Sequence, residues 1–319
     1  MSIYKIRDWI NLDNLIWYWL SSNPNAIYLL EQNKHKINWN MLSSNPNAIH
    51  LLESNPNKID WFYLSQNTNA LTLLEQNQTL INWSLVSENP CALPLLKQRP
   101  DKIDWVLLSN NHNPEVIPLL EKNIDKINWV WLSRNPGAIR LLELNPDKIH
   151  WDSLSGNPGA IRLLELNPDK IHWDSLSGNP AAIHLLELNP DKINWGSLSG
   201  NPAAIHLLEP NPDKIHWGSL SGNPAAIHLL ELNPDKIDWN NLAENPNGVP
   251  LLNTHYPFDN IKHLYKLSSN PNIFTTNYEF LKKRLVDTGI AEGVVMNRFN
   301  PKNIGKFVDW GYDEFENIG

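Results

Sequence analysis

Apolar positions along this chain repeat with a constant step, and tryptophan marks the repeat most clearly. The step between tryptophans is 22 residues, apart from one step of 24 between Trp105 and Trp129. A period of this length is typical of a repeat solenoid, in which each unit packs its apolar face on its neighbours. The tryptophans of the series are Trp17, Trp39, Trp61, Trp83, Trp105, Trp129, Trp151, Trp173, Trp195, Trp217 and Trp239.

The first half of the repeat, taken from residues 45–66, predicts an α-helix of about eight residues. Asn45 is a suitable cap, and Pro46 is tolerated at the first helical position because its missing N–H would be unpaired there. We expect the helix to end near Asn55 in the left-handed conformation, because Pro56 cannot continue it. The apolar face of this helix consists of Ala48, Ile49, Leu51 and Leu52.

The second half of the same repeat predicts a very short helix, α or 3₁₀, from Trp61 to about Ser65. Asp60 would cap it, and Ile59 and Leu64 have the spacing of a hydrophobic staple. From Trp39 onward, every tryptophan of the series follows an Asn, Asp or His. Neither helix is long enough to be stable alone in water, so stability must come from stacking of the repeats.

These patterns predict an all-α fold, an α-solenoid of about eleven to twelve helix pairs arranged as a rod or superhelix of roughly 100 Å. We expect an N-terminal cap and first half-repeat over 1–22, tandem repeats over 23–253, a degenerate repeat over 254–276 and a helical C-terminal cap over 277–319. Residues 135–156 and 157–178 are identical, which suggests recent duplication.

Two irregularities interrupt the pattern. Two extra residues fall within 110–114, between helices, where added loop length has little energetic cost. They are either a tolerated insertion or a bend between two functional segments. Pro94, Pro118 and Pro250 fall inside first helices, which they are expected to distort.

Composition narrows the range of functions. The net charge of −8 argues against a general nucleic-acid binder and against docking on anionic lipid. The single cysteine, Cys91, leaves no intramolecular disulfide framework. No segment approaches the ~18–20 apolar residues that span a bilayer, and the N-terminus lacks the features of a signal peptide. The chain is therefore expected to be soluble and intracellular.

The sequence offers no pattern typical of a catalytic, cofactor or metal site. The 11 histidines include two rows, one with His184, His206 and His228 and another with His150, His172 and His216. Equivalent residues of neighbouring layers lie ~10 Å apart, too far to share one zinc ion unless the two rows adjoin. The chain also lacks a Gly-rich phosphate loop and a nucleophile elbow. We therefore expect neither an enzyme nor a cofactor.

Variable surface positions are the candidates for a protein-binding site. Apolar side chains among them would mark a binding face if exposed; alternatively, they are partly buried between layers. One set lies between Ile and Leu-Leu of the first helix: Tyr28, His50, Thr72, Arg140, Arg162, His184, His206 and His228, with Pro94, Pro118 and Pro250 at the same position. The second set follows the tryptophans: Tyr18, Trp19, Phe62, Tyr63, Val130 and Trp131. RNA readers that use one repeat per base need longer helical units and a basic track, which this chain lacks.

The repeat unit L-S-x-N-P-x-A-I-x-L-L-E-x-N-P-D-K-I-x-W resembles short tandem repeats in proteins of giant nucleocytoplasmic DNA viruses, mimivirus-like ones especially. The resemblance covers about residues 12–273, and the ending RFNPKNIGKFVDWGYDEF is similar to C-terminal tails of such proteins. It implies a viral protein present in host cytoplasm and carries over no catalytic residue. We expect a non-catalytic scaffold for protein–protein interaction between virus and host. The alternative is a structural component of a viral particle or factory.

Overall fold

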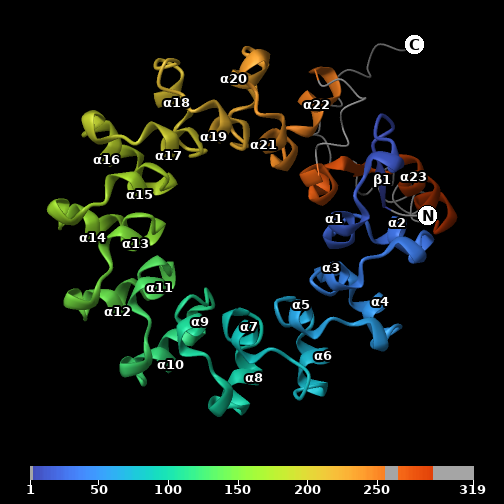
Figure 1. Ribbon diagram of the computed structural model, residues 1–319, viewed down its shortest axis with the longest axis horizontal. Helices are drawn as coiled ribbons and strands as arrows, with labels where there is room; N and C mark the ends of the chain where they lie inside the picture. The colour runs from blue at the N-terminus through green and yellow to red at the C-terminus, as the bar shows by residue number, and fades with distance from the viewer. Residues whose placement is uncertain (1–2, 256–264, 290–319) are drawn as a thin grey trace, which may run out of the picture. The chain divides into compact units, whose positions relative to one another are not determined.

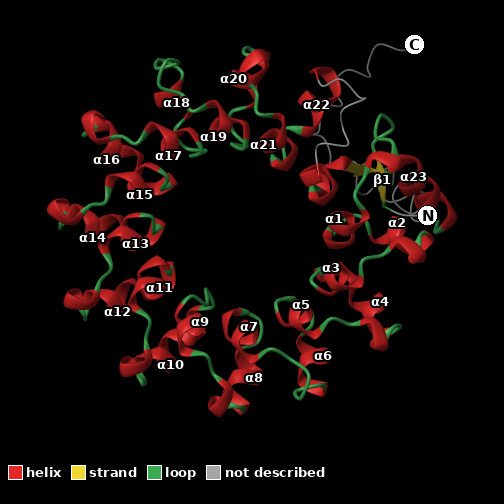
Figure 2. Ribbon diagram, in the orientation of Figure 1, coloured by secondary structure: helices red, strands yellow, loops and turns green. Residues whose placement is uncertain are grey.

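The computed structural model describes residues 3–255 and 265–289 (Figure 1), and these form the all-α repeat fold that the sequence predicts. The repeats make up one compact unit, Asp8–Ile273, and a second unit combines Met1–Arg7 with Phe274–Gly319. Short helices alternate with loops through the repeat unit (Figure 2). No helix among the described residues combines the length and apolar character needed to cross a bilayer.

Each tryptophan of the series begins a short α-helix, as predicted. We call these the Trp helices; those of consecutive repeats contact one another and form one row (Figure 1). They are α1 Trp17–Ser22, α3 Trp39–Ser43, α5 Trp61–Ser65, α7 Trp83–Glu88, α9 Trp105–Ser109, α11 Trp129–Arg134, α13 Trp151–Ser155, α15 Trp173–Ser177, α17 Trp195–Ser199, α19 Trp217–Ser221 and α21 Trp239–Glu244.

The other helix of each repeat follows the Asn-Pro pair or its equivalent, and we call these the N-P helices. They form a second row (Figure 1). They are α2 Ile27–Gln32, α4 Ile49–Glu53, α6 Leu71–Gln76, α8 Leu93–Gln98, α10 Ile117–Glu121, α12 Ile139–Glu143, α14 Ile161–Glu165, α16 Ile183–Glu187, α18 Ile205–Leu208, α20 Ile227–Glu231 and α22 Val249–His255.

The predicted first helix consists of a 3₁₀ turn, η3 (Pro46–Ala48), followed by α4. Asn45 caps the turn, and its side chain accepts the N–H of Asn47. The predicted left-handed end at Asn55 is wrong, because its φ is −137°. Its Nδ2 instead donates to the carbonyl of Leu51, the residue four positions earlier, and so pairs one of the free carbonyls at the helix end. A further 3₁₀ turn, η4 (Pro56–Lys58), follows.

The expected distortion by proline is also wrong at Pro94 and Pro118. The α-helix proper starts after the 3₁₀ turn or its equivalent, which places these prolines in its first turn. A proline there removes no hydrogen bond that the helix would otherwise make.

The core consists of leucines and alanines, and the tryptophans lie at its edge. Leu42 of α3 and Leu52 of α4 have no exposed surface, as is true of their equivalents through the repeats. Such residues contribute ~1.5–3 kcal/mol each. Every tryptophan of the series is half-buried. A lysine of the next repeat covers many of these rings, as Lys58 covers Trp39 with its Nζ 4.5 Å from the ring centroid.

Buried asparagines connect each repeat to the one before it. Asn45 is fully buried, and its Nδ2 donates to the backbone carbonyls of Ser21 at 3.0 Å and Asn23 at 2.9 Å. The same residue therefore caps its own turn and pairs carbonyls of the preceding repeat. We call the asparagines in this role the ladder asparagines. Each donates to at least one backbone carbonyl of an adjacent repeat. They are Asn23, Asn45, Asn67, Asn89, Asn111, Asn135, Asn157, Asn179, Asn201, Asn223, Asn245 and Asn270.

Buried serines make a second set of bonds between repeats. Ser43 Oγ donates to the carbonyl of Trp39 and accepts the backbone N–H of Asp60 in the next repeat. The bond from Asp60 to Ser43 therefore holds in place the residue that caps the next Trp helix, α5. The ladder serines in this role are Ser21, Ser43, Ser65, Ser87, Ser109, Ser133, Ser155, Ser177, Ser199 and Ser221.

The first and last repeats are joined by the same bonds. Asn23 Nδ2 donates to the carbonyls of Ser268 at 3.1 Å and Asn270 at 3.0 Å, and the N–H of Ile16 donates to Ser268 Oγ at 2.8 Å. The expectation of a rod or superhelix is therefore wrong: the row of repeats closes on itself. We call this junction the seam.

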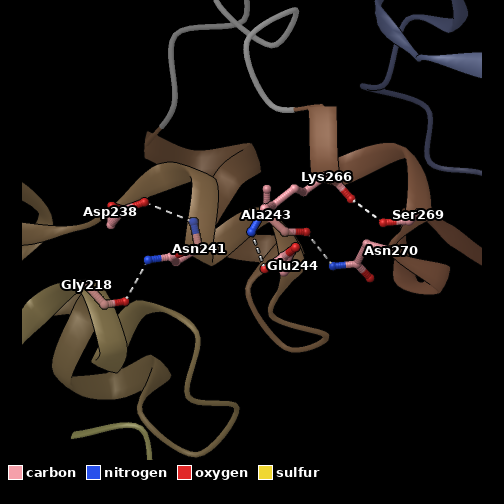
Figure 3. A network of polar contacts seen from close by, with 8 residues as sticks. All are labelled: Gly218, Asp238, Asn241, Ala243, Glu244, Lys266, Ser269 and Asn270. Atoms are coloured by element: carbon pink, nitrogen blue, oxygen red, sulfur yellow. Dashed lines mark hydrogen bonds and ion pairs between the residues drawn. The ribbon is translucent and has the colours of Figure 1, made fainter. Parts of the chain in front are cut away.

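The segment on the far side of the seam belongs to the degenerate repeat. Its 3₁₀ helices are η16 (Tyr265–Ser269) and η17 (Pro271–Ile273). Figure 3 shows its attachment to α21: Asn270 Nδ2 donates to the carbonyl of Ala243 at 2.8 Å, and Lys266 Nζ lies 2.7 Å from Glu244 Oε2. The sequence decays in this repeat, and Ala243 replaces the serine of other Trp helices, but the asparagine bonds to the preceding repeat remain.

The two-residue insertion lies between α9 and α10 and leaves the ladder intact. Asn111 takes the ladder position and donates to the carbonyls of Ser87 and Asn89. Asn113, two residues later, caps the next 3₁₀ turn. Two asparagines thus share the roles that one asparagine fills elsewhere, which is why the insertion is tolerated.

The second unit contains a small antiparallel sheet and one longer helix. Strand β1 (Tyr4–Ile6) pairs with β2 (Phe274–Thr276), with Lys5 opposite Thr275. Asn277 caps α23 (Tyr278–Asp287). The C-terminal cap predicted over 277–319 stays a prediction, since residues 290–319, including the virus-like tail, lie outside the described residues.

Candidate interaction surface

The residue after each tryptophan lies on the exposed side of its Trp helix in most repeats. Apolar side chains occupy this position at Tyr18, Phe62, Val106 and Val130, which are 41–51% exposed. We call these four residues the apolar row. In α5 the cap Asp60 holds the backbone at this position, because its Oδ1 accepts the N–H groups of Phe62 and Tyr63.

Four aromatic side chains gather at the start of this row. Tyr18 and Trp19 are in edge-to-face contact with centroids 5.0 Å apart, and Phe62 and Tyr63 are in similar contact at 5.5 Å. We call these four residues the aromatic cluster. The Tyr18 side chain also interacts with that of Tyr63, so the cluster connects α1 with α5.

Interaction with the Tyr18 side chain is the main cause that raises the pKa of Tyr63 above its ordinary value of 10.0. The electrostatic effects of Tyr18 and Asp60 and the partial burial of the ring act in the same direction. A raised pKa means that the contact favours the protonated phenol. The contribution of this contact to the free energy of unfolding is therefore complete below the ordinary pKa of tyrosine. It is lost as the pH rises through the raised pKa of Tyr63.

Replacing Tyr18 by phenylalanine is expected to lower the pKa of Tyr63 toward 10.0, because the interaction with the Tyr18 hydroxyl is removed while the ring is kept. The measurement is a titration of tyrosinate absorbance in the ultraviolet, compared with wild type. Tyr28→Phe provides the control and should leave the Tyr63 transition unchanged. An unchanged Tyr63 transition in Tyr18→Phe would show that the two side chains do not contact in solution.

The remaining predicted residues do not all join this surface. Trp131 is half-buried, and Arg134 of its own helix lies over its ring at 5.0 Å. Tyr28 is half-buried, whereas Thr72, Arg140 and Arg162 are exposed. These last four lie on the N-P helices, which form a separate row from the Trp helices.

The predicted histidines make contacts between repeats. His50 Nε2 lies 3.0 Å from Glu31 Oε1 of the preceding repeat. The same pair recurs as His184–Glu165 at 2.8 Å, His206–Glu187 at 3.0 Å and His228–Glu209 at 2.6 Å. The other row consists of caps: His150 Nδ1 accepts the N–H of Ser153.

The described residues contain no group of three or more His, Cys, Asp or Glu side chains placed to hold a metal ion. An open cleft of about 620 Å³ lies between α10 and the following repeat, beside Trp129. It is lined by Glu121, Lys122, Ile124, Asp125, Trp129 and Lys148. Its carboxylates and ammonium groups balance in number, so it presents no single charge to a ligand.

The polar half of the repeat unit presents a different surface. At the positions after tryptophan, α13 to α21 carry Asp, Ser, Gly and Asn in place of bulky apolar residues. Highly exposed leucines occur instead just after some N-P helices, at Leu144, Leu166, Leu188 and Leu232. Sequence analysis missed them, although Gln at the same position of earlier repeats was a signal that this site faces solvent.

No protein-family model matches this chain, and neither the curated proteins nor the solved structures include one similar to it.

Proposed function

We propose that this protein is a non-catalytic repeat scaffold that binds a protein partner through the aromatic cluster and the adjoining apolar row. The exposure of Tyr18 and Phe62 beside Trp19 and Tyr63 carries the proposal. Scattered apolar residues on a surface need no explanation, but a contiguous apolar patch marks an interaction site. Tyrosine and tryptophan in particular are enriched among the residues that dominate binding energy.

The mutual contacts of the cluster favour binding. Edge-to-face packing within each pair, and the interaction between Tyr18 and Tyr63, hold the rings before a partner arrives. A surface that is already ordered loses less side-chain entropy on binding. The Trp helices below are in turn held by ladder serines and asparagines, so the site rests on a rigid support.

The resemblance of the repeat unit to giant-virus proteins supports a host protein as the partner and host cytoplasm as the place. The net charge of −8 favours a protein over a nucleic acid. A structural role in a viral particle or factory is the alternative, and the experiment below separates the two.

Replacing Tyr18 and Phe62 by asparagine is expected to weaken partner binding by about 2 kcal/mol or more per residue. Asparagine occupies the equivalent position in α3, at Asn40, so the repeat tolerates it. The measurement is quantitative capture from host lysate by wild type and by the double variant, followed by affinity measurement with the captured protein. Asp152→Asn changes the same repeat position in the polar half and should leave capture unchanged.

Equal capture of the same proteins by wild type and the double variant would exclude this surface. The second measurement in this test is the protein composition of purified viral particles. Stoichiometric presence of the chain in particles, without a variant-sensitive host partner, would favour the structural role instead.

A further inference from the structure

The seam has the same construction as the junctions inside the row of repeats. Beside the bonds of Asn23, Asn25 Nδ2 donates to the carbonyl of Pro271 at 3.1 Å. One repeat further on, Asn47 Nδ2 donates in the same way to the carbonyl of Pro24. Two complementary surfaces therefore meet at the seam. We call them the first face, which carries Asn23 and Asn25, and the last face, which carries the carbonyl of Pro271.

Apolar contacts accompany these hydrogen bonds. Across the seam α1 contacts η16, as it contacts α3 within the row. Leu20 of α1 is fully buried, and Leu267 of η16 is 1% exposed. Opening the seam would expose apolar surface and unpaired polar groups on both faces, and a solenoid end of this kind needs a cover.

The seam differs from the other junctions because the chain does not cross it. The N–H of Ile16 and Oγ of Ser268 are bonded at 2.8 Å but lie 252 residues apart in sequence, whereas consecutive repeats are joined by the chain itself. The two faces can therefore come from different molecules with the bonds of the seam unchanged. The structure thus shows the surface that covers each face, which is the other face of this chain.

The second unit contains a pairing of the same kind. In sequence, β1 precedes the first repeat and β2 directly follows the last. The strands pair over three residues each, and the N–H of Asn277 donates to the carbonyl of Ile3 at 2.7 Å. A second copy of the chain offers the same backbone groups, so this pairing can also form between molecules.

We propose that the seam is also an assembly site for a second copy of this chain, in which the first face of one molecule pairs with the last face of another. Such pairing is head-to-tail, because each molecule contributes a different face. Closure within one molecule competes with it, because the two faces of one chain are held at a high effective concentration. Pairing between molecules therefore increases with protein concentration and with the fraction of molecules whose seam is open.

Cysteines placed on opposite faces test this proposal in full-length chains. A Cβ built at Gly137, the residue equivalent to Asn25, lies 4.0 Å from the proline Cβ of the preceding repeat, which suits a disulfide. Asn25→Cys and Pro271→Cys are therefore made in separate chains, each of which also carries Cys91→Ser. Both positions should tolerate the change, because Cys91 and Thr68 occupy them in other repeats.

The two chains are mixed in urea below the unfolding transition and oxidised with glutathione disulfide. We expect a disulfide-linked dimer of the two chains, in a yield that rises with protein concentration and exceeds that of either chain alone by about tenfold. Adding Asn23→Ala to the Asn25→Cys chain should lower this yield, because the first face loses its bonds to the last face. One chain that carries both Asn25→Cys and Pro271→Cys should form an internal disulfide, which verifies the geometry.

An interior junction provides the matched control. Cys91 and Thr68 have the same relation across that junction as Asn25 and Pro271 have across the seam. Thr68→Cys in the otherwise native chain should therefore form an internal disulfide with Cys91. A mixture of wild type with the Thr68→Cys/Cys91→Ser chain should give no linked dimer above background, because the chain keeps both sides of that junction together.

An absence of linked dimer from the seam mixture, while the doubly substituted chain forms its internal disulfide, would show that the faces pair only within one molecule and would overturn the proposal. Equal yields from the seam and interior mixtures would also contradict it, because the links would then report exposed thiols and not the faces. Failure of the doubly substituted chain to form its internal disulfide would refute the seam itself. None of these substitutions alters the aromatic cluster, so the result does not depend on the proposed partner binding.

Discussion

Replacing the ladder asparagine Asn179 by alanine is expected to lower the free energy of unfolding by about 3 kcal/mol. The loss combines one helix cap, ~1 kcal/mol, with a buried carbonyl deprived of its donor, ~1–3 kcal/mol. In the structure, Asn179 Nδ2 donates to the carbonyls of Ser155 and Asn157, and Oδ1 accepts the N–H of Ala181. Urea unfolding monitored by circular dichroism measures the change.

A second substitution separates the two roles of this residue. Asn179→Asp keeps an oxygen that can cap the turn but removes the amide donor and buries a charge beside carbonyl oxygens. If Asn179 were only a cap, aspartate would be neutral, because it caps as well as asparagine. We expect it to destabilise at least as much as alanine. Asp191→Asn, at an exposed position, should stay within about 0.5 kcal/mol of wild type.

Breaking the seam is expected to destabilise the repeat unit as much as breaking an interior junction. The seam variant Asn23→Ala/Ser268→Ala removes the bonds from Asn23 to Ser268 and Asn270 and from Ile16 to Ser268. The expected loss is about 3–5 kcal/mol, from buried groups left without partners and one lost cap. Amides of α1 should then exchange with solvent faster, as at the end of an open array.

The matched interior variant is Ser199→Ala/Asn223→Ala, which removes the three equivalent bonds between interior repeats, from Asn223 to Ser199 and Asn201 and from His216 to Ser199. In a closed row of repeats, either variant opens one junction, so their unfolding curves should be similar. In an open solenoid, the interior variant would split the array while the seam variant would lose little more than a cap. A seam variant with near-wild-type stability, or rapid exchange of α1 amides in wild type, would contradict closure.

Parts of the candidate site could be predicted because exposure follows from helical position. The spacing from each tryptophan identified Tyr18, Phe62 and Val130 as surface residues, and all three are exposed. The Tyr18–Tyr63 contact could not be predicted, because it spans two repeats and depends on how they stack. The exposure of Leu144, Leu166, Leu188 and Leu232 was missed because leucine beside a helical apolar face is normally assigned to the core.

The sequence by itself determined the period, the two helices of each repeat and most of their caps. These features depend on neighbouring residues: Asp60 caps α5 through N–H groups two and three positions away. Only the tertiary structure decided what joins the repeats and how the row ends. The donors of Asn45 pair with carbonyls 22 and 24 residues earlier, and Asn23 reaches Ser268 across 245 residues. Closure depends on the small rotation between stacked repeats, which accumulates along the row, and no local pattern in the sequence encodes that sum.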